Sequence, residues 1–259
     1  MPAVEVKGVR KAYALNGRVV PVLDSVSFSV GPGEFVAILG PSGCGKSTLL
    51  NLIAGLEEPS AGTIAIQGAV PRKRTGLCAY MHQKDLLLPW RTVLDNAILP
   101  LEVQGVPRKA ARERALALMD VFGLRGFEHA YPFTLSGGMR QRAAFLRTVL
   151  AGKSIVLLDE PFGALDALTR ASLQDWLASL WEALRLTVLL VTHDVEEALF
   201  LADRVLVLTP RPARVRGVVP VSLPRPRQRE MVTSPPFVRL KAEVFQMLTG
   251  TQVAQEAPP

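Results

Sequence analysis

The chain has 259 residues, of which 49% are hydrophobic and 20% are charged, as is usual for a globular protein with one large domain. No apolar stretch approaches the roughly 18 to 20 residues that span a bilayer, the start is unlike a signal peptide, and only two cysteines occur, so we expect a cytosolic protein. The net charge of +7 permits nucleic-acid binding, but the basic residues are scattered.

The apolar residues of the N-terminal part alternate with polar ones, at Val4 and Val6, then from Val26 to Val30, then at Ile64 and Ile66. This period of two predicts half-buried antiparallel strands. By contrast, residues 35–39, 155–158 and 188–191 are continuous apolar runs, as expected for parallel strands covered by helices on both faces. The expected fold class is therefore α/β.

A glycine-rich loop follows the first of these apolar runs and leads into a helical pattern. It fits G-x-x-x-x-G-K-[ST] and comprises Gly40, Pro41, Ser42, Gly43, Cys44, Gly45, Lys46, Ser47 and Thr48. Its backbone N–H groups can converge on phosphate oxygens, with the positive end of the helix dipole behind them. Lys46 would reach the β- and γ-phosphates, and the Ser47 hydroxyl would bind Mg²⁺. Alternatively, the segment is a glycine-rich turn with an incidental lysine.

Residues from about 90 to 150 are predicted to form a mostly helical insert, because apolar residues recur at helical spacing there. Within it, Ser136, Gly137 and Gly138 begin an amphipathic helix and offer a second anion site made of free N–H groups. By itself such a cap is weak evidence, since many helices begin this way.

Two carboxylates end the strand predicted at residues 155–158. Asp159 would lie near the metal, and Glu160 beside the γ-phosphate would act as general base toward an attacking water. The alternative is an acidic pair that caps a strand before the turn at Pro161.

Together, these motifs resemble those of the ATP-binding subunit of an ABC transporter, over about residues 4 to 208. The resemblance makes Leu135 to Met139 the signature segment, with Met139 where the family commonly has glutamine. It makes His193 the switch histidine near the γ-phosphate, although a histidine after a strand is often only a turn residue. It also places the D-loop at residues 163–166, with Gly163 in place of serine and with Asp166 acting across a dimer interface or simply capping a helix.

Three more positions carry roles by resemblance alone. Tyr13 would stack on adenine or be an ordinary core tyrosine, and Val22 would pack nearby. Gln83 would contact Mg²⁺ and the attacking water, with His82 where an aromatic residue is commoner.

The resemblance implies a P-loop α/β core with an antiparallel β subdomain and an inserted helical subdomain. It divides the chain into an ABC-type ATP-binding domain at residues 1–209, with the helical subdomain at about 90–150, and an extension at 210–259. It implies ATP and Mg²⁺ as ligands, and a second copy of the chain that completes each ATP site. It further implies an integral membrane permease as partner, with this chain bound peripherally at the cytoplasmic face of the cell membrane. A solute-binding protein would take part indirectly, and no nucleic acid is expected.

Import is favoured, and segments 87–93 and 159–166 are similar to the branch that handles nitrate, sulfonates, taurine or thiamine precursors. The alternative is a soluble ABC ATPase that acts on nucleic acid or ribosomes. A P-loop kinase would leave the signature segment unexplained. The segment from Leu86 to Trp90, after Gln83, is apolar or rigid where a loop would normally be polar. Its leucines either pack inside the helical subdomain or contact the permease, and we expect Trp90 to anchor the permease.

After Pro210 the composition shifts to proline and arginine, which predicts a loosely organised extension with one terminal helix at Phe237 to Leu248. The densest basic group, from Arg211 to Arg229, would form a solvated face or be attracted to an anionic membrane surface.

Overall fold

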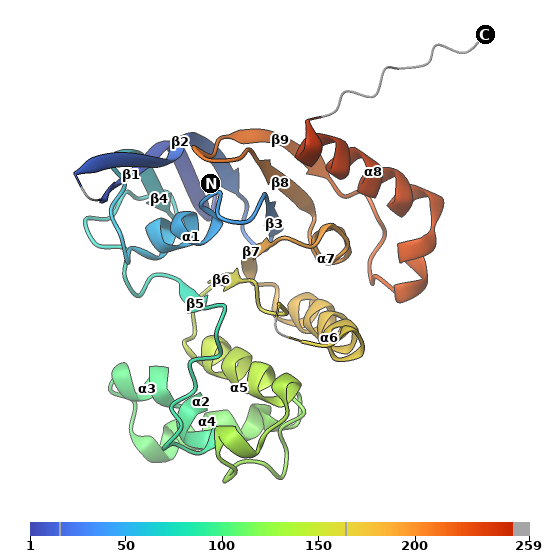
Figure 1. The fold of residues 1–259 in the computed structure, drawn as a ribbon. Coiled ribbons are helices and arrows are strands. Elements are labelled where there is room, and N and C mark those ends of the chain that lie inside the picture. Colours follow the sequence, from blue (N-terminus) through green and yellow to red (C-terminus); the bar gives the residue numbers. More distant parts are fainter. Residues whose placement is uncertain (16, 164, 251–259) are drawn as a thin grey trace.

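A computed structural model describes residues 1–15, 17–163 and 165–250. Ala164 of the expected D-loop and residues 251–259 of the expected extension lie outside the described residues. Figure 1 shows two lobes, one that holds both sheets and one built of helices.

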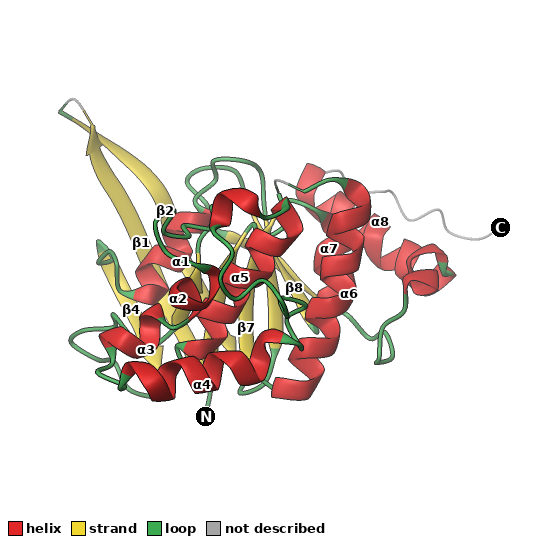
Figure 2. Ribbon diagram, turned by 90° about the horizontal axis from the view of Figure 1, so that it is seen from below, coloured by secondary structure: helices red, strands yellow, loops and turns green. Residues whose placement is uncertain are grey.

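The smaller sheet is antiparallel and confirms the three strands predicted from alternation. Its strands, in sheet order, are β2 (Arg18–Val30), β1 (Val4–Leu15) and β4 (Ala61–Ile66). Strands β1 and β2 form a long ribbon that projects beyond the rest of the molecule (Figure 2).

The larger sheet has six strands and is parallel except at one edge. In sheet order they are β5 (Ala79–Met81), β6 (Ile155–Asp159), β7 (Thr187–Thr192), β3 (Phe35–Leu39), β8 (Arg204–Leu208) and β9 (Val215–Pro220). Strands β3, β6 and β7 are the continuous apolar runs, and all their residues are buried. Phe35 and Ala37 belong to the core on one face of the sheet, and Val36 and Ile38 to the core on the other, which explains why these runs do not alternate.

The helical lobe lies between β5 and β6 in the sequence, as expected for an insert. It contains α2 (Val93–Ala97), α3 (Leu99–Val103), α4 (Arg108–Met119), the 3₁₀ turn η1 (Pro132–Thr134) and α5 (Gly137–Leu150). The remaining helices are α1 (Lys46–Ala54), α6 (Ala167–Leu184), α7 (Val195–Leu201), the 3₁₀ turn η2 (Arg229–Thr233) and α8 (Pro235–Thr249). None of the described helices has the length and apolar character needed to cross a membrane.

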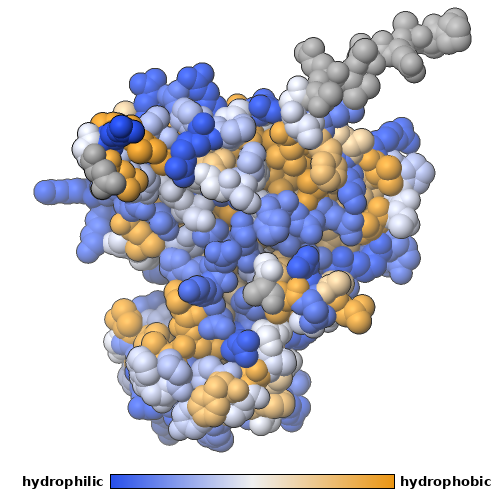
Figure 3. All heavy atoms as spheres, viewed as in Figure 1, coloured by the Kyte–Doolittle hydropathy of each residue, from blue (hydrophilic) through white to orange (hydrophobic). Residues whose placement is uncertain are grey.

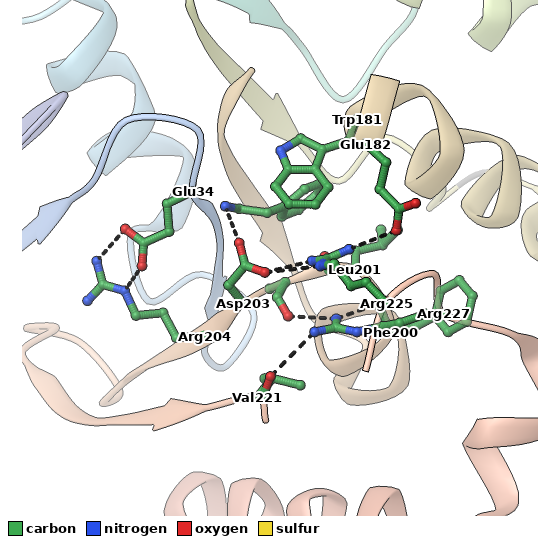
Figure 4. Close-up of polar contacts among 12 residues, drawn as sticks. Glu34, Trp181, Glu182, Phe200, Leu201, Asp203, Arg204, Val221, Arg225 and Arg227 are labelled. Atoms are coloured by element: carbon green, nitrogen blue, oxygen red, sulfur yellow. Dashed lines mark hydrogen bonds and ion pairs between the residues drawn. The ribbon is translucent and has the colours of Figure 1, made fainter. Parts of the chain in front are cut away.

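The chain after Pro210 is more ordered than its proline content predicts. Strand β9 pairs with β8, and α8 packs against α7 with Phe237 and Val244 fully buried. Figure 4 shows Arg227 at the end of α7, where its Nη1 donates to the carbonyls of Leu199, Phe200 and Ala202. A cation stabilises the negative end of a helix dipole, so this arginine holds the extension against the sheet-bearing lobe.

The other arginines of the segment have partners within the chain, and Arg211, Arg214 and Arg216 are exposed all the same, in agreement with the expected solvated face. Each has a partner far away in the sequence: Arg211 with the Gly43 carbonyl, Arg214 with Asp24, Arg216 with the Met247 carbonyl, Arg225 with Asp203, and Arg229 with Asp175.

Candidate active site

The phosphate loop lies between the end of β3 and the start of α1, as the sequence predicts. Lys46 is only 5% exposed, and its Nζ donates to the Gly40 carbonyl at 2.8 Å and to the Pro41 carbonyl at 3.1 Å. Gly45 has φ +120°, and a Cβ added there would lie 2.7 Å from Val22 Cγ1, so only glycine fits. The loop therefore curls around the lysine, with Val22 packed beneath it.

A second group of polar atoms meets behind the loop. Ser47 Oγ donates to Asp159 Oδ1 at 3.0 Å, and Tyr80 OH donates to Asp159 Oδ2 at 3.3 Å. Burial raises the pKa of Asp159, while these two hydrogen bonds act in the opposite direction. The sequence predicted that Ser47 and Asp159 would be near each other, and the structure brings them together.

Glu160 is the meeting point of two further side chains from different parts of the chain. Gln83 Nε2 donates to its Oε2 at 3.3 Å, and His193 Nδ1 lies 3.2 Å from the same oxygen. The carboxylate can accept a proton, the imidazole can donate or accept one, and the amide can orient either partner. The three residues singled out from separate motifs thus form one cluster beside Asp159.

Tyr13 lies on β1, half-buried against the core of the smaller sheet. Its hydroxyl donates to Glu57 Oε2 at 2.6 Å, and Lys11 Nζ stands 4.9 Å from the ring centre. Val22 is 2% exposed and packs beneath the phosphate loop. Stacking of Tyr13 on adenine therefore stays a prediction.

The second predicted anion site is the start of α5, in the helical lobe, whereas α1 is in the other lobe (Figure 1). Ser136 caps α5 and accepts a hydrogen bond from Met139 N, and Gly137 and Gly138 form the first turn. A hollow of about 560 Å³ opens beside Ser136, Gly138 and Met139. Within one chain, the two helix starts are thus held apart.

Asp166 caps α6 and accepts a hydrogen bond from Thr169 N at 3.0 Å. The capping alternative raised from the sequence is therefore present in the structure. Its predicted action across a dimer interface remains a prediction.

Sequence reasoning missed three residues around this site. Arg211 Nη2 donates to the Gly43 carbonyl at the tip of the phosphate loop, at 2.9 Å. Tyr80 holds Asp159, and Glu197 is buried behind His193. The sequence shows that Arg211 belongs to a basic segment and that Tyr80 precedes Gln83. It does not show which distant residue either side chain contacts.

Known proteins resemble this chain over most of its length. The ABC transporter family matches residues 23–163. The formylaminopyrimidine import ATP-binding protein ThiZ of Halalkalibacterium halodurans is 50% identical over 83% of this chain and 83% of its own length. The taurine import ATP-binding protein TauB of Rhizobium johnstonii is 43% identical over 94% of this chain and 95% of its own.

The fold also matches a solved structure. The dimeric structure of MJ0796, a bacterial ABC transporter cassette, is 31% identical, has a TM-score of 0.74, and covers 85% of this chain and 99% of its own. A second structure of MJ0796, in a post-hydrolysis state bound to ADP and Pi, matches equally well.

Proposed function

The chain belongs to the ABC transporter family and is an ATPase, and from that premise we propose that it powers the import of a small solute through a separate membrane permease. The observation that carries the proposal is the convergence of Gln83 and His193 on one oxygen of Glu160, beside Asp159 and the phosphate loop. ATP hydrolysis needs such a base next to bound phosphates.

In this proposal the phosphate loop binds the β- and γ-phosphates through its N–H groups, and Lys46 adds a positive charge. Glu160 accepts a proton from the attacking water. His193 and Gln83 both contact the Glu160 carboxylate. Through these contacts they orient Glu160 and the attacking water.

The donor set also suits Mg²⁺. Ser47 Oγ and Asp159 Oδ1 are hard oxygen donors 3.0 Å apart, and Gln83 would be the third protein ligand. No cluster of three or more His, Cys, Asp or Glu residues occurs in the described part of the chain, which suits a metal held by few protein ligands and by substrate phosphates. The ion would neutralise charge on the β- and γ-phosphates.

We propose further that the working form is a dimer of two copies. Because the start of α5 is in the other lobe from the phosphate loop, its free N–H groups would bind the γ-phosphate held by the partner copy. Each ATP would then lie between Lys46 of one copy and Ser136, Gly137 and Gly138 of the other, so that binding closes the dimer and hydrolysis opens it.

The permease contact is proposed at the segment after Gln83. Trp90 is 72% exposed and Leu86 is 52% exposed, although both are apolar. Arg147 donates to the Leu86 carbonyl and also lines an adjoining cavity of about 390 Å³. Figure 3 shows apolar surface on the helical lobe near its junction with the other lobe. Exposed apolar patches of this kind bind partners, and tryptophan is a frequent anchor.

Trp90→Glu tests this contact. We expect the isolated variant to keep its basal ATPase activity, since Trp90 is exposed, but to lose stimulation of ATPase by cargo in the reconstituted transporter. Leu116→Glu, an exposed position on α4, is the matched control and should keep full stimulation. Full stimulation of Trp90→Glu in an assembled complex would refute the contact.

The solute is proposed to belong to the class of nitrate, sulfonates, taurine or thiamine precursors, which includes the cargoes named for the relatives. Affinity purification of the tagged chain should retain a polytopic membrane protein. Reconstitution of that complex with its binding protein then identifies the solute that stimulates ATP hydrolysis. Copurification of nucleic acid or ribosomes instead would favour the rival function.

A further inference from the structure

A small cavity lies behind the pair formed by Glu160 and His193. Its volume is about 10 Å³, which is the size of one water molecule. Besides Glu160 and His193, its walls include Arg170 of α6, Thr192 at the end of β7 and Glu197 of α7. The cavity thus borders both the residues proposed to act on water and two ionisable side chains, Arg170 and Glu197, to which we have assigned no role.

Glu197 is the most deeply buried carboxylate of this wall, with an exposed fraction of 4%. Its Oε2 accepts a hydrogen bond from Gln174 Nε2 at 3.2 Å, whereas Oε1 has no hydrogen-bond partner among the described residues. Burial raises the pKa of Glu197 to about 8, and Asp194 adds to the shift, while Thr192, Gln174 and Arg170 oppose it. Near pH 7 the carboxyl is therefore mostly neutral and can donate its proton.

Arg170 provides a second unsatisfied group on the same wall. Its Nε is buried and has no partner within the described part of the chain. Its Nη2 donates to the Leu165 carbonyl at 2.9 Å, and its Nη1 lies 3.9 Å from Asp194 Oδ2. Because Leu165 precedes Asp166 and Asp194 follows His193, this arginine links the D-loop to the switch histidine.

Unpaired buried polar groups are costly, and a buried water needs two to four polar partners. Glu197 and Arg170, which carry these two unpartnered atoms, line a cavity of that size, and Glu160 and His193 line it as well. We propose that the cavity binds one ordered water, which bridges Glu197 to the Glu160–His193 pair and makes Glu197 a positioning residue for that pair. The proposal rests on the roles proposed above for Glu160 and His193.

The bridge works only while Glu197 is neutral. Ionised Glu197 would repel Asp194 and Glu160 and attract Arg170, which changes how the Glu160–His193 pair is held. Arg229 donates to Gln174 Oε1 at 2.9 Å, and Gln174 in turn donates to Glu197. On the outer face of α7, Glu196 is paired with Lys241.

The test measures kcat and KM for ATP as a function of pH in the full chain and in Glu197→Gln. The amide has the shape of the neutral carboxyl but cannot ionise, so this variant should keep wild-type kcat at pH 7. In the wild type, kcat should fall as the pH rises, with a midpoint near pH 8. One pH unit above that midpoint only about a tenth of Glu197 is neutral, so kcat should be about tenfold lower there. Glu197→Gln should lack this fall, and KM should stay unchanged in both.

Glu196→Gln is the matched control, one residue away on the same helix, and should keep the wild-type pH profile. A wild type without an alkaline limb near pH 8, or a Glu197→Gln variant that keeps the limb, overturns the proposal. If the wild type and Glu196→Gln both fail to hydrolyse ATP at any pH, the roles proposed for the catalytic pair fail instead.

If Glu197→Gln does not fold, Gln174→Leu replaces it. Loss of the amide that donates to Glu197 removes a bond that favours the ionised carboxylate, so the pKa of Glu197 rises further. The alkaline limb must then move to higher pH. A limb that stays at the wild-type midpoint overturns the proposal.

Discussion

Glu160 combines an unusual backbone with a converging set of side chains. Its φ is +44°, in the left-handed region that non-glycine residues rarely adopt, at a cost of about 1 kcal/mol or more. Its N–H donates to the Val191 carbonyl of β7, which holds this conformation. The backbone thereby aims the carboxylate at Gln83 and His193 rather than along the strand.

Glu160→Gln should bind ATP normally and lose hydrolysis by roughly 10² to 10⁴ fold, because the amide keeps the shape but cannot accept a proton. Phosphate release measures the loss, and light scattering with ATP should find a trapped dimer. Glu113→Gln, an exposed position on α4, should behave as wild type. Turnover near normal in Glu160→Gln, or an ATP-bound monomer, would count against its assigned role.

Lys46→Ala should act earlier, on nucleotide binding itself. The side chain is buried inside the loop, and a charge-assisted hydrogen bond is worth about 1.5 to 3 kcal/mol, or roughly ten- to a hundredfold in Kd. Filter binding of ATP measures the change, and Lys109→Ala, on the exposed surface of α4, is the control. Undiminished ATP affinity would refute the assignment.

The cluster around Glu160 could be predicted in part, because Asp159, Glu160 and His193 end or follow a recognisable apolar run, whereas Gln83 was placed by resemblance alone. Asp159 ends β6, Glu160 and His193 directly follow β6 and β7, and Gln83 comes shortly after β5. The carboxyl ends of parallel strands meet at one edge of a sheet. Glu197 could not be predicted, since a glutamate in a helix looks solvated until its neighbours are known. Its burial depends on the packing of α7 against α6 and β3.

At the scale of elements, the loop between β8 and β9 reaches the phosphate loop from outside the expected ATP-binding domain. Ala213 N donates to the Val22 carbonyl, and Asp24 N donates to the Ala213 carbonyl, so the loop is fixed to β2 directly under the phosphate loop. Arg211 then reaches the Gly43 carbonyl. Burial raises the pKa of Cys44, and the charges of Lys46 and Arg211 oppose that shift, so both charges act at the phosphate loop.

Arg211→Gln should therefore weaken ATP binding and leave kcat little changed. A lost hydrogen bond of about 0.5 to 1.5 kcal/mol corresponds to roughly two- to tenfold in Kd, and the difference should shrink at high salt. Arg216→Gln is the control, since Arg216 is also exposed but donates to the Met247 carbonyl of α8. Equal Kd values for the two variants would show that Arg211 does not assist binding.

Strand β9 shows why the C-terminal elements were hard to read from the sequence. It lies at the edge of the sheet, next to β8. Proline is tolerated in an edge strand, so Pro220 can end a strand inside a proline-rich segment. The helix predicted at residues 237–248 is present, as part of α8. By contrast, β3 was predicted to the residue, because a central strand buried on both faces has a continuous apolar pattern.

At the scale of the whole molecule, the cores on the two faces of the large sheet unite parts of the chain that are far apart in sequence. One core extends from β3 through the helical lobe to α8, and includes both Phe35 and Phe237. The boundary predicted at residue 209 is thus crossed by core contacts, as well as by the bonds of Arg225 and Arg227 shown in Figure 4. Such contacts favour unfolding of the extension together with the core.

Phe237→Ala tests that coupling. Phe237 is fully buried at the start of α8, so its truncation should lower the free energy of unfolding by about 3 to 5 kcal/mol. Urea denaturation followed by tryptophan fluorescence should then show one transition, at a lower midpoint, because Trp176 and Trp181 pack in or against the same core. Val238→Ala, on the same helix turn but 52% exposed, should leave the midpoint nearly unchanged. If Phe237→Ala leaves the main midpoint in place and adds a transition at lower urea concentration, the extension unfolds on its own. Arg227 would then bind the extension to α7 without making the extension part of the core.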